Sequence, residues 1–469
     1  MDYGFRRRCR CLAATFAVLY LAACSSLFAQ QSASSAAITI AQAVDDALRN
    51  YPSIRVTQEQ MTAAAAGIRL AQTAYLPRVD GLAQVNRATR NTFYGLLLPQ
   101  NILPGLDGVP ANNFGTVWDS GLGILVTWQP FDFGLRAANV AVATAGRERA
   151  QAAVTRTQYD VSVATADAFL TVIAAQQTAQ AAQAAVDSWQ VLLKSIHAVV
   201  AAQLRPGADE SRVQAELAVA QTQLAQAQQA IDVARATLAQ FVGIVPSQLN
   251  LNAGKVVDQL PTERPEAPLE VASNPLALEQ TAATAQLQSQ LKALGRTYYP
   301  EFAVQGLAGA RGTGEELNGG RLGALNGLAP TTQNYGIGLT VTFPAMDRFA
   351  LREQEAMQSA NIRAAQAQSS VIAANLQAQF ETALATLAGT RRVASATPVE
   401  VSSARAALQQ ATARYQSGLA PIDDVAQAQR LLVQAQIDDA LAHLNVWRAR
   451  LQIETARGSI QPFLAEATQ

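Results

Sequence analysis

The sequence predicts a mainly α-helical protein that also contributes strands to a membrane β-barrel, built from two internal repeats of a β-hairpin followed by a long α-hairpin. Charged residues make up 15% of the chain, against roughly 25% in ordinary soluble domains. No apolar run of about 18 to 20 residues follows the N-terminal region, so no transmembrane helix is expected in the mature chain. Two stretches of about 70 residues are nearly free of proline and glycine. Low charge without a spanning helix favours a membrane β-barrel.

The first 30 residues predict a secretory leader, because four arginines precede a short apolar run at 12–23. Two interpretations of its end stay open. Cleavage after Ala29 gives a signal peptide of residues 1–29. Alternatively, Leu21-Ala22-Ala23-Cys24 resembles a bacterial lipobox, so that residues 1–23 are removed and Cys24 becomes a lipidated N-terminus. All three cysteines lie at or before Cys24, so the mature protein is expected to have no disulfide bond.

Proline and glycine landmarks reveal the repeat. Pro52 and Pro77 are 25 residues apart, as are Pro275 and Pro300, and the two pairs are offset by 223 residues. The segment 121–128 matches 336–343, but at an offset of 215. The missing eight residues must fall between these landmarks, where both copies are rich in turn-forming residues. Length changes collect in exposed loops, so loops are expected at 88–116 and 312–333.

These landmarks divide the chain. After the leader we expect a first repeat at 38–243, a linker at 244–270, a second repeat at 271–458 and a C-terminal tail at 459–469. Each repeat begins with a shorter helix, at about 40–75 and about 275–298. The expected strands are about 78–87, 117–128, 301–311 and 334–343; the long helices are 135–204 and 350–417; the return helices are 208–243 and 421–457.

Two of the expected strands have a membrane-like pattern. Apolar side chains share one face at period two, with Ser120 and Leu125 as exceptions. Ten residues at about 3.3 Å each, tilted by about 40°, span roughly 25 Å, the height of a barrel's apolar band. Aromatic residues at both ends predict interfacial girdles. These residues are Trp118 and Trp128 in one strand, and Tyr335 and Phe343 in the other.

Four strands cannot close a barrel, and lipid does not tolerate an open strand edge. Bacterial barrels have about eight strands or more, so a dimer is the minimum and a trimer supplies twelve.

The two long helices are too long for a compact domain, because a helix of 70 residues extends about 105 Å. Each long helix must turn back, first at Arg205-Pro206-Gly207 and then at Gly418-Leu419-Ala420-Pro421. Alanine and glutamine dominate, with Leu, Val and Ile at helical spacing, which is typical of coiled-coil packing.

Three motifs carry a family resemblance. The segment Ile38–Pro52, the tetrad Ala74-Tyr75-Leu76-Pro77, and Arg414–Gly418 followed by Asp424–Gln429 stand in the order and spacing of one family. The chain resembles the TolC-type outer membrane efflux and export channels, also called outer membrane factors, across nearly all of its mature length.

The resemblance implies a homotrimer in the outer membrane of a Gram-negative bacterium. Its 12-stranded barrel would contact outer-membrane lipid and continue into a helical barrel across the periplasm. The trimer would be the passive exit duct of a tripartite efflux pump or a type I secretion system. Partners would be a periplasmic adaptor (membrane fusion) protein and an inner-membrane RND pump or ABC exporter. The adaptor would dock at the two helical tips, at Arg205, Pro206, Gly207, Gly418, Leu419, Ala420 and Pro421. The competing hypothesis is a periplasmic coiled coil without a pore, structural or adhesive in role.

In some members of the family, two acidic rings narrow the periplasmic mouth. Asp424 occupies one such position, but Gln427 stands one turn later, where a second carboxylate would be needed. The first tip also departs from the family's glycine-leucine turn. Asp209, Glu210 and Asp423 are therefore further candidates for the gate. The alternative is that these acids only favour the positive end of a helix dipole.

The sequence offers little for catalysis. His197 and His443 lie on separate predicted helices, without the spacing of zinc ligands. No phosphate-binding loop or nucleophile motif stands out. The net charge is zero, without the basic excess usual for nucleic-acid binding. We therefore expect neither an enzyme nor a cofactor, and no nucleic-acid partner.

Overall fold

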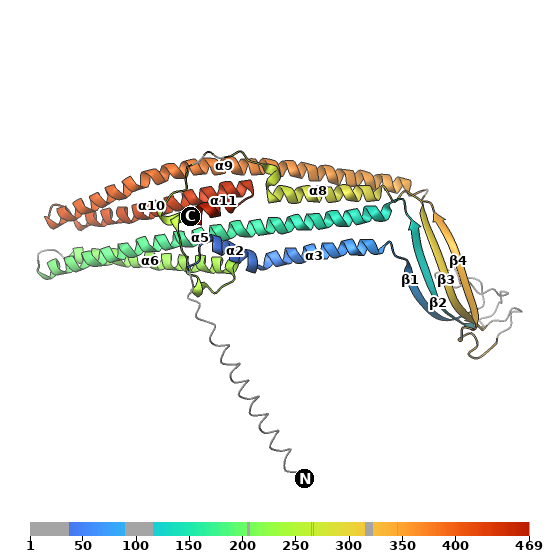
Figure 1. Cartoon of the computed structure of the whole chain (residues 1–469). Coiled ribbons are helices and arrows are strands. Elements are labelled where there is room, and N and C mark those ends of the chain that lie inside the picture. The colour runs from blue at the N-terminus through green and yellow to red at the C-terminus, as the bar shows by residue number, and fades with distance from the viewer. Residues whose placement is uncertain are drawn as a thin grey trace, which may run out of the picture. The chain divides into compact units, whose positions relative to one another are not determined.

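The computed structural model describes residues 37–89, 116–203, 207–263, 265, 267–314, 322–344 and 346–468 (Figure 1). The leader, Cys24, Arg205, Pro206 and most of the first expected loop lie outside the described residues. The chain forms two compact units. One comprises Met1–Ile54, Thr157–Asn274 and Asn375–Gln469; the other comprises Arg55–Arg156 and Pro275–Ala374. No helix in the described part of the chain combines the length and apolarity needed to cross a membrane.

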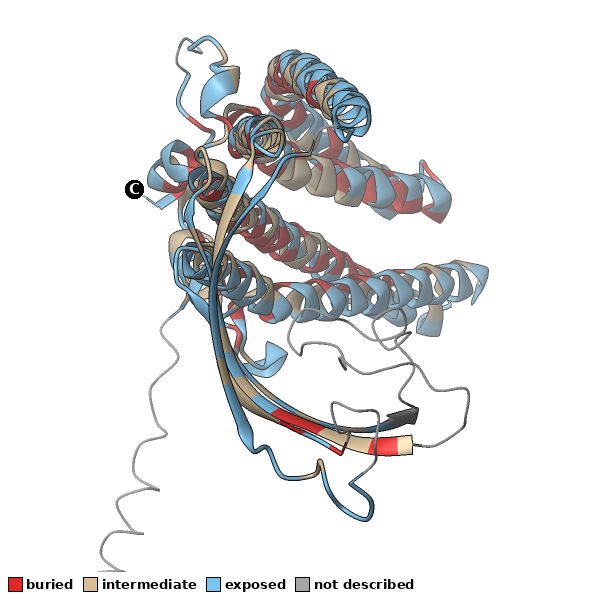
Figure 2. Ribbon diagram, turned by 90° about the vertical axis from the view of Figure 1, so that its right-hand side faces the viewer, coloured by how far each residue is buried: buried red, intermediate tan, exposed pale blue. Residues whose placement is uncertain are grey.

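The second unit contains one four-stranded antiparallel sheet in the order β1-β2-β3-β4. The strands are β1 (Arg78–Thr89), β2 (Thr116–Phe131), β3 (Glu301–Thr313) and β4 (Thr332–Thr342). The strand expected at 117–128 thus continues to Phe131, past a register shift between Trp128 and Phe131. The sheet curves along its length (Figure 2). Among the described residues only β2 and β3 have a partner strand on both sides, so β1 and β4 each have one edge that no described strand pairs with.

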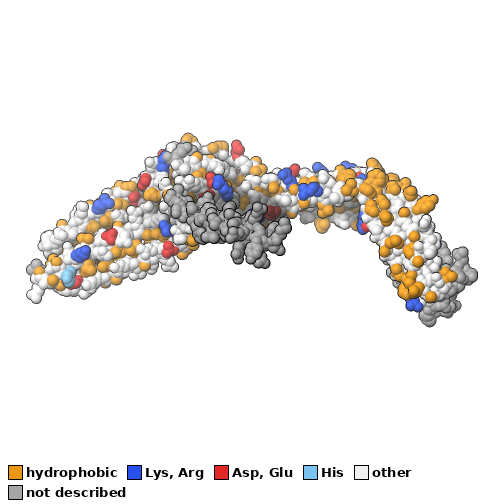
Figure 3. Space-filling view, turned by 60° about the horizontal axis from the view of Figure 1, so that its bottom comes forward, with side chains coloured by type: hydrophobic (Ala, Val, Ile, Leu, Met, Phe, Trp, Pro, Cys, Tyr) orange, Lys and Arg blue, Asp and Glu red, His pale blue; other side chains and the backbone are white. Residues whose placement is uncertain are grey.

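The strand register separates an apolar face from a polar one. One row across the sheet is Val79, Val126, Gly306 and Ile337, because each is paired with the next. Rows two residues away along the strands share this face. Many of its side chains are exposed, including Ile337 at 86% and Tyr335 at 89%, and hydrophobic side chains gather over the sheet in Figure 3. The opposite face carries small residues and three leucines, Leu82, Leu125 and Leu307, together with the polar residues Asp80, Gln84, Asp119, Thr127, Gln305, Arg311, Asn334 and Thr340.

Glutamine side chains link helices within the same unit. α8 (Pro275–Leu294) lies beside the first part of α9 (Arg348–Gln416). The amide of Gln358 donates to the Leu287 carbonyl at 3.0 Å, and the amide of Gln280 donates to the Ala365 carbonyl at 2.9 Å. Such bonds explain why glutamine can replace larger apolar residues where helices approach closely. α3 (Pro52–Thr73) also contributes most of its length to this unit.

The first unit holds two helical hairpins with a seven-residue repeat of buried positions. The first hairpin pairs α5 (Leu135–Ala201) with α6 (Gly207–Val242), and the second pairs α9 with α10 (Ile422–Arg457). Buried residues run as stripes along these helices in Figure 2. A strict seven-residue repeat is the spacing of a left-handed coiled coil. The repeat comprises Val213, Ala220, Ala227 and Ala234 in α6, Phe380, Leu387 and Ala394 in α9, and Ala428, Ala435, Ala442, Ala449 and Ala456 in α10.

Helix α9 continues through Pro398. A proline has no backbone N–H, so the carbonyl four residues earlier, that of Ala394, loses its usual donor. The Thr397 hydroxyl lies 3.5 Å from this carbonyl and 2.6 Å from Asp439 Oδ1 on α10. Neighbouring side chains thus hold the helix where its own hydrogen-bond ladder is broken.

The helix expected at about 40–75 is divided in two. α2 (Ile40–Asn50) begins with a capping box in which Thr39 and Gln42 exchange hydrogen bonds of 2.9 and 3.3 Å. Tyr51 is extended, because the ring of Pro52 disfavours a helical conformation in the preceding residue. α3 then begins at Pro52, where the missing N–H costs nothing.

The expected C-terminal tail contains a buried helix. Gly458 ends α10 at φ +84°, and the N–H of Ser459 donates back to the Glu454 carbonyl at 3.2 Å. The chain then forms α11 (Gln461–Thr468), whose Phe463, Leu464 and Ala467 enter the main core beside Trp447. The linker packs here too, because Trp447 Nε1 donates to the Gln259 carbonyl at 2.8 Å.

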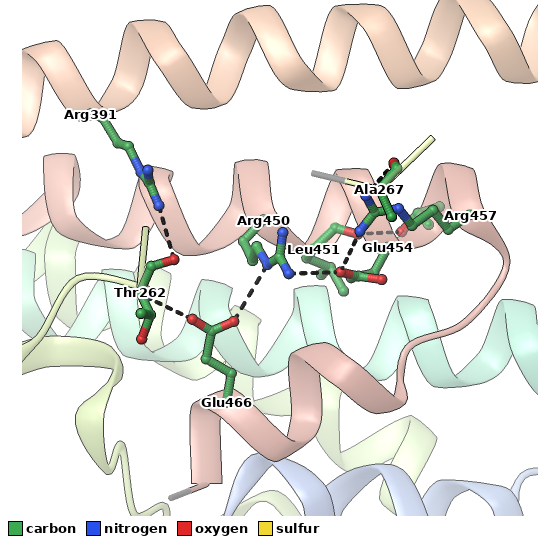
Figure 4. Close-up of polar contacts among 9 residues, drawn as sticks. Thr262, Ala267, Arg391, Arg450, Leu451, Glu454, Arg457 and Glu466 are labelled. Atoms are coloured by element: carbon green, nitrogen blue, oxygen red, sulfur yellow. Dashed lines mark hydrogen bonds and ion pairs between the residues drawn. The ribbon is translucent and has the colours of Figure 1, made fainter. Parts of the chain in front are cut away.

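Charged groups connect α11 to its surroundings (Figure 4). Arg450 and Glu454 form an ion pair of 2.9 Å with both side chains 2% exposed. Glu466 of α11 contacts Arg450 Nε at 3.4 Å and accepts from the Thr262 N–H at 2.7 Å. Arg457 pairs with Glu454 at 3.2 Å and donates to the Ala267 carbonyl at 2.7 Å. Linker, α10 and α11 thus share one network.

Candidate functional site

The turn of the second hairpin is built around one glycine. Gly418 adopts φ +76°, a left-handed conformation that a side chain would disfavour. The N–H of Leu419 donates to the Arg414 carbonyl at 2.8 Å, which satisfies an end carbonyl of α9. Ala420 is buried, whereas Leu419 is 72% exposed. Pro421 is the N-cap residue of α10, so of the predicted docking residues at this tip Leu419 is the prominent apolar one.

The turn of the first hairpin is described only from Gly207, where α6 begins. The predicted docking residues Arg205 and Pro206 lie outside the described residues. Asp209 and Glu210 stand in the first turn of α6, at the positive end of its dipole. Glu210 lies 2.9 Å from His197 Nδ1 on α5, so it joins the two arms of its own hairpin.

Three polar contacts join the two hairpins near their tips. The Tyr415 hydroxyl of α9 donates to Asp209 Oδ2 at 3.0 Å. Arg212 pairs with Asp423 at 3.1 Å. Further from the tips, Arg430 of α10 pairs with Glu216 of α6 at 3.7 Å. An apolar cluster lies among the same four helices and contains Val186, Trp189, Ile196, Val213, Ala220, Tyr415, Ile422, Val425 and Ala426.

The five predicted gate residues therefore differ in environment. Asp209, Glu210 and Asp423 are held by contacts within the chain. Asp424 and Gln427 are exposed, and Asp424 forms no ion pair with any described residue. Sequence reasoning missed Arg212, Glu216 and Arg430, because pairs between separate helices follow no local spacing. The sequence shows only acidic residues in the first turns of both return helices, with Arg212 and Arg430 further along them.

At the helix-side end of the sheet, aromatic and charged residues form a junction. Trp128 Nε1 donates to the Tyr75 carbonyl at 3.2 Å, and the guanidinium of Arg136 lies 4.7 Å from the centre of the Tyr75 ring. Arg136 also pairs with Asp132 at 2.9 Å, with the two side chains 9% and 14% exposed. Partial burial alone would raise the pKa of Asp132. Hydrogen bonds from Arg136 and the Gly134 N–H outweigh it and hold the pKa below its ordinary value.

The predicted aromatic girdle has more members at this end than the sequence indicated. Four aromatic rings pack against one another with ring centres 4.6 to 6.2 Å apart, in edge-to-face, tilted and stacked pairs: Phe131, Phe133, Phe302 and Tyr299. Phe343 meets Tyr298 at 6.2 Å.

At the other end of the sheet, Arg87 lies 5.2 Å over the Trp118 ring. Tyr335 is paired with Ala308, which is paired with Ile124, so Tyr335 and Trp118 lie at different register positions. Within the described residues, no group of three or more His, Cys, Asp or Glu side chains is placed to hold a metal ion.

Comparison with curated protein sequences finds no match. Solved structures do share the fold. The VceC outer membrane protein of Vibrio cholerae has 18% identity and a TM-score of 0.68, over 90% of this chain and 96% of that one. The CmeC outer membrane channel of Campylobacter jejuni has 14% identity and a TM-score of 0.70, over 92% and 89%. The MtrE outer membrane channel of Neisseria gonorrhoeae, solved in its open state, has 17% identity and a TM-score of 0.70, over 92% and 90%.

These structures confirm the predicted fold class, a helical barrel combined with a β-barrel. The family itself is shown by sequence. Because the family model for outer membrane efflux proteins matches residues 43–244 and 269–459, which is most of the chain, this protein belongs to the outer membrane efflux protein family.

Proposed function

We propose that the chain is the outer-membrane exit duct of a tripartite efflux pump or a type I secretion system, and that it works as a homotrimer. The observation that carries this proposal is the sheet with one apolar, solvent-exposed face and two unpaired edges. In water such a surface would aggregate. In a membrane the apolar face meets lipid, and the polar face lines a wet interior.

Closure of the sheet supports an oligomer. The free edges of β1 and β4 present backbone groups that need partners in lipid. Pairing β4 of one copy with β1 of the next satisfies both edges. Three copies give twelve strands, within the range of bacterial barrels. The helices of the three copies then form a tunnel on the periplasmic side, which fits the coiled-coil repeat of the two hairpins.

The tips supply a gate. The Tyr415–Asp209 and Arg212–Asp423 contacts hold the second hairpin against the first in each copy. Breaking them frees the hairpins to repack and widen the mouth, a change between two packings of the same helices. The duct itself supplies no energy. Substrate is driven by an inner-membrane RND pump or ABC exporter through a periplasmic adaptor.

The adaptor would meet the tips at Leu419 and its neighbours. Beside them a groove of about 640 Å³ lies between α5 and the second hairpin, with Trp189, Val191, Ile196, Val199 and Leu408 in its lining. Such a groove suits the apolar stripe of a helix. The competing hypothesis, a periplasmic coiled coil without a pore, gives no role to the apolar sheet face and is not favoured by the family assignment.

Two experiments test the proposal. Trimers purified from outer membranes should give discrete conductance steps in planar bilayers. Cysteines scanned along β1 and β4 should cross-link neighbouring copies into a ladder that ends at the trimer. A single cysteine in β2, which is paired on both sides within the chain, is the control and should give no ladder. Well-folded protein that neither conducts nor cross-links beyond the monomer would contradict the proposal.

A further inference from the structure

A groove of about 470 Å³ lies on the apolar face of the sheet, toward the end where the strands join the helices. Gly306 lies at its centre, between Val126 and Ile337 in register. Because glycine has no side chain, this row has a notch between two branched side chains that are 36% and 86% exposed. The remaining lining is Tyr75, Pro77, Trp128, Val304 and Gln305, the last of which points to the polar face by register.

We propose that this groove binds one acyl chain of a glycerophospholipid from the leaflet that faces the periplasm, an inference that rests on the proposed membrane location. The groove continues the apolar face that would contact lipid. Its volume lies within the roughly 300 to 1,000 Å³ typical of small-ligand sites. Within a membrane, close packing decides which surfaces associate, and a notch flanked by side chains packs more of a methylene chain than a flat face.

The aromatic end of the groove orients the lipid. Tyr75 and Trp128, 44% and 43% exposed, combine an apolar ring with a polar group, which places such residues at the headgroup level. The helices follow directly at this end, so the headgroup belongs to the periplasmic leaflet. That leaflet supplies phospholipid, whereas lipid A belongs to the outer leaflet.

The acyl chain, and not a negative headgroup, is the recognised feature. Arg136 stacks on Tyr75, but its charge is engaged by Asp132 at 2.9 Å and it is nearly buried. Arg78, at the start of β1, is paired with Asp80 at 2.9 Å. The groove should therefore hold phosphatidylethanolamine and phosphatidylglycerol alike.

Filling the notch tests the site. A side chain added at Gly306 meets no atom within 4 Å of its Cβ, so Gly306→Leu should fold normally. Gly81 is a matched control, because it lies on the same face, is equally open and is outside the groove. Trimers are delipidated in detergent, incubated with either phospholipid and examined by native mass spectrometry. The wild type and Gly81→Leu should each retain one phospholipid per chain, of either headgroup, and Gly306→Leu should retain none.

Four results would overturn the inference: no retention by the wild type, equal retention by Gly306→Leu, equal loss in Gly81→Leu, or retention of lipid A in place of phospholipid. A preference of more than tenfold for phosphatidylglycerol would overturn the claim of headgroup independence. Bilayer conductance of the same preparations separates this inference from the proposed function. Trimers that conduct but retain no phospholipid refute the groove alone, whereas trimers that do not insert refute the duct.

Discussion

The Tyr415 hydroxyl of α9 donates a 3.0 Å hydrogen bond to Asp209 of α6, and so joins the end of one long helix to the start of the other hairpin's return helix. Tyr415 is otherwise buried in the apolar cluster behind the tips. Tyr415→Phe removes the hydroxyl and keeps the ring, so the packing should survive while the contact is lost. We expect the time-averaged conductance of single reconstituted trimers to rise severalfold. A closed packing held by one fewer hydrogen bond opens more often, so the open probability increases.

Tyr51→Phe is the control for this variant. It removes a hydroxyl between α2 and α3, where the ring packs on Phe241 at 5.1 Å and not at the tips. Its conductance should match the wild type. Adding Asp209→Asn to Tyr415→Phe should change little, since both act on the same bond. An unchanged conductance in Tyr415→Phe would exclude this contact from the gate.

The exposed carboxylate of Asp424, which pairs with no described residue, gives a different prediction. In a trimer, three copies of an exposed acid near the mouth would attract divalent cations. Asp424→Asn should therefore weaken block of the conductance by divalent cations. Asp423→Asn is the comparison, because Asp423 is already paired with Arg212 at 3.1 Å. Asp423→Asn should weaken divalent block less than Asp424→Asn does. It should raise the open probability more than Asp424→Asn does. If block in Asp424→Asn is the same as in the wild type, Asp424 does not line the mouth.

The sequence was sufficient for the fold class because its signals are long. Period-two alternation in the strands, two runs of about 70 residues nearly free of breakers and the repeat of proline landmarks all survive without tertiary information. The break at Tyr51 was also within reach, since Pro52 disfavours helix in the residue before it.

Other features depend on contacts that no local pattern encodes. α11 is only eight residues long, and it forms because the core offers a place for Phe463 and Leu464. The pairing of Arg212 with Asp423 joins residues far apart in the sequence, so it follows from how the hairpins pack. The notch at Gly306 exists only once register places Val126 and Ile337 beside it.

Leu419 should be an anchor for the adaptor. The residue after a helix-ending glycine usually folds back on the helix, but Leu419 is 72% exposed. Leu419→Glu should weaken binding of the purified adaptor at least tenfold in a surface-capture assay, because an exposed apolar anchor becomes a charge. Val399→Glu, on α9 before the tip and 66% exposed, is the matched control and should bind normally. Equal binding by both variants would remove Leu419 from the interface.

Asp132 predicts a pH-dependent stability of the strand-to-helix junction. Its carboxylate accepts from the Arg136 N–H at 2.6 Å and caps α5. Asp132→Asn should lower the free energy of unfolding by about 1 kcal/mol at pH 7. The pKa of Asp132 in the folded protein is below its unfolded value of about 3.9. The contribution of the carboxylate to stability is therefore complete above about pH 3.9, and it is lost as the pH falls through the folded pKa. The difference in denaturation midpoint between wild type and variant should therefore shrink below about pH 4. Asp347→Asn, at the equivalent but exposed position in the second repeat, is the control and should leave the denaturation midpoint at pH 7 unchanged.

The buried pair of Arg450 and Glu454 should be among the most sensitive positions in the first unit. Arg450→Met leaves Glu454 with Arg457 alone and separates Glu466 from its guanidinium partner. Removing one member of a buried pair typically costs about 3 to 5 kcal/mol. We expect a loss of that order in urea denaturation followed by tryptophan fluorescence. Arg448→Met, whose 30% exposed side chain faces Asp167 at 3.7 Å, should cost less than about 1 kcal/mol.

A second substitution distinguishes loss of charge balance from loss of packing in this network. Glu466→Gln keeps an acceptor for the Thr262 N–H and removes one of the two carboxylate charges that Arg450 contacts. The double variant should therefore be more stable than Arg450→Met alone, because one of the two negative charges that faced Arg450 is gone. If the double variant is less stable by the sum of the two single losses, Arg450 acts through its packing against α11. If Arg450→Met is no more destabilising than Arg448→Met, the pair contributes no net stability, and apolar contacts of Phe463 and Leu464 hold α11 in place.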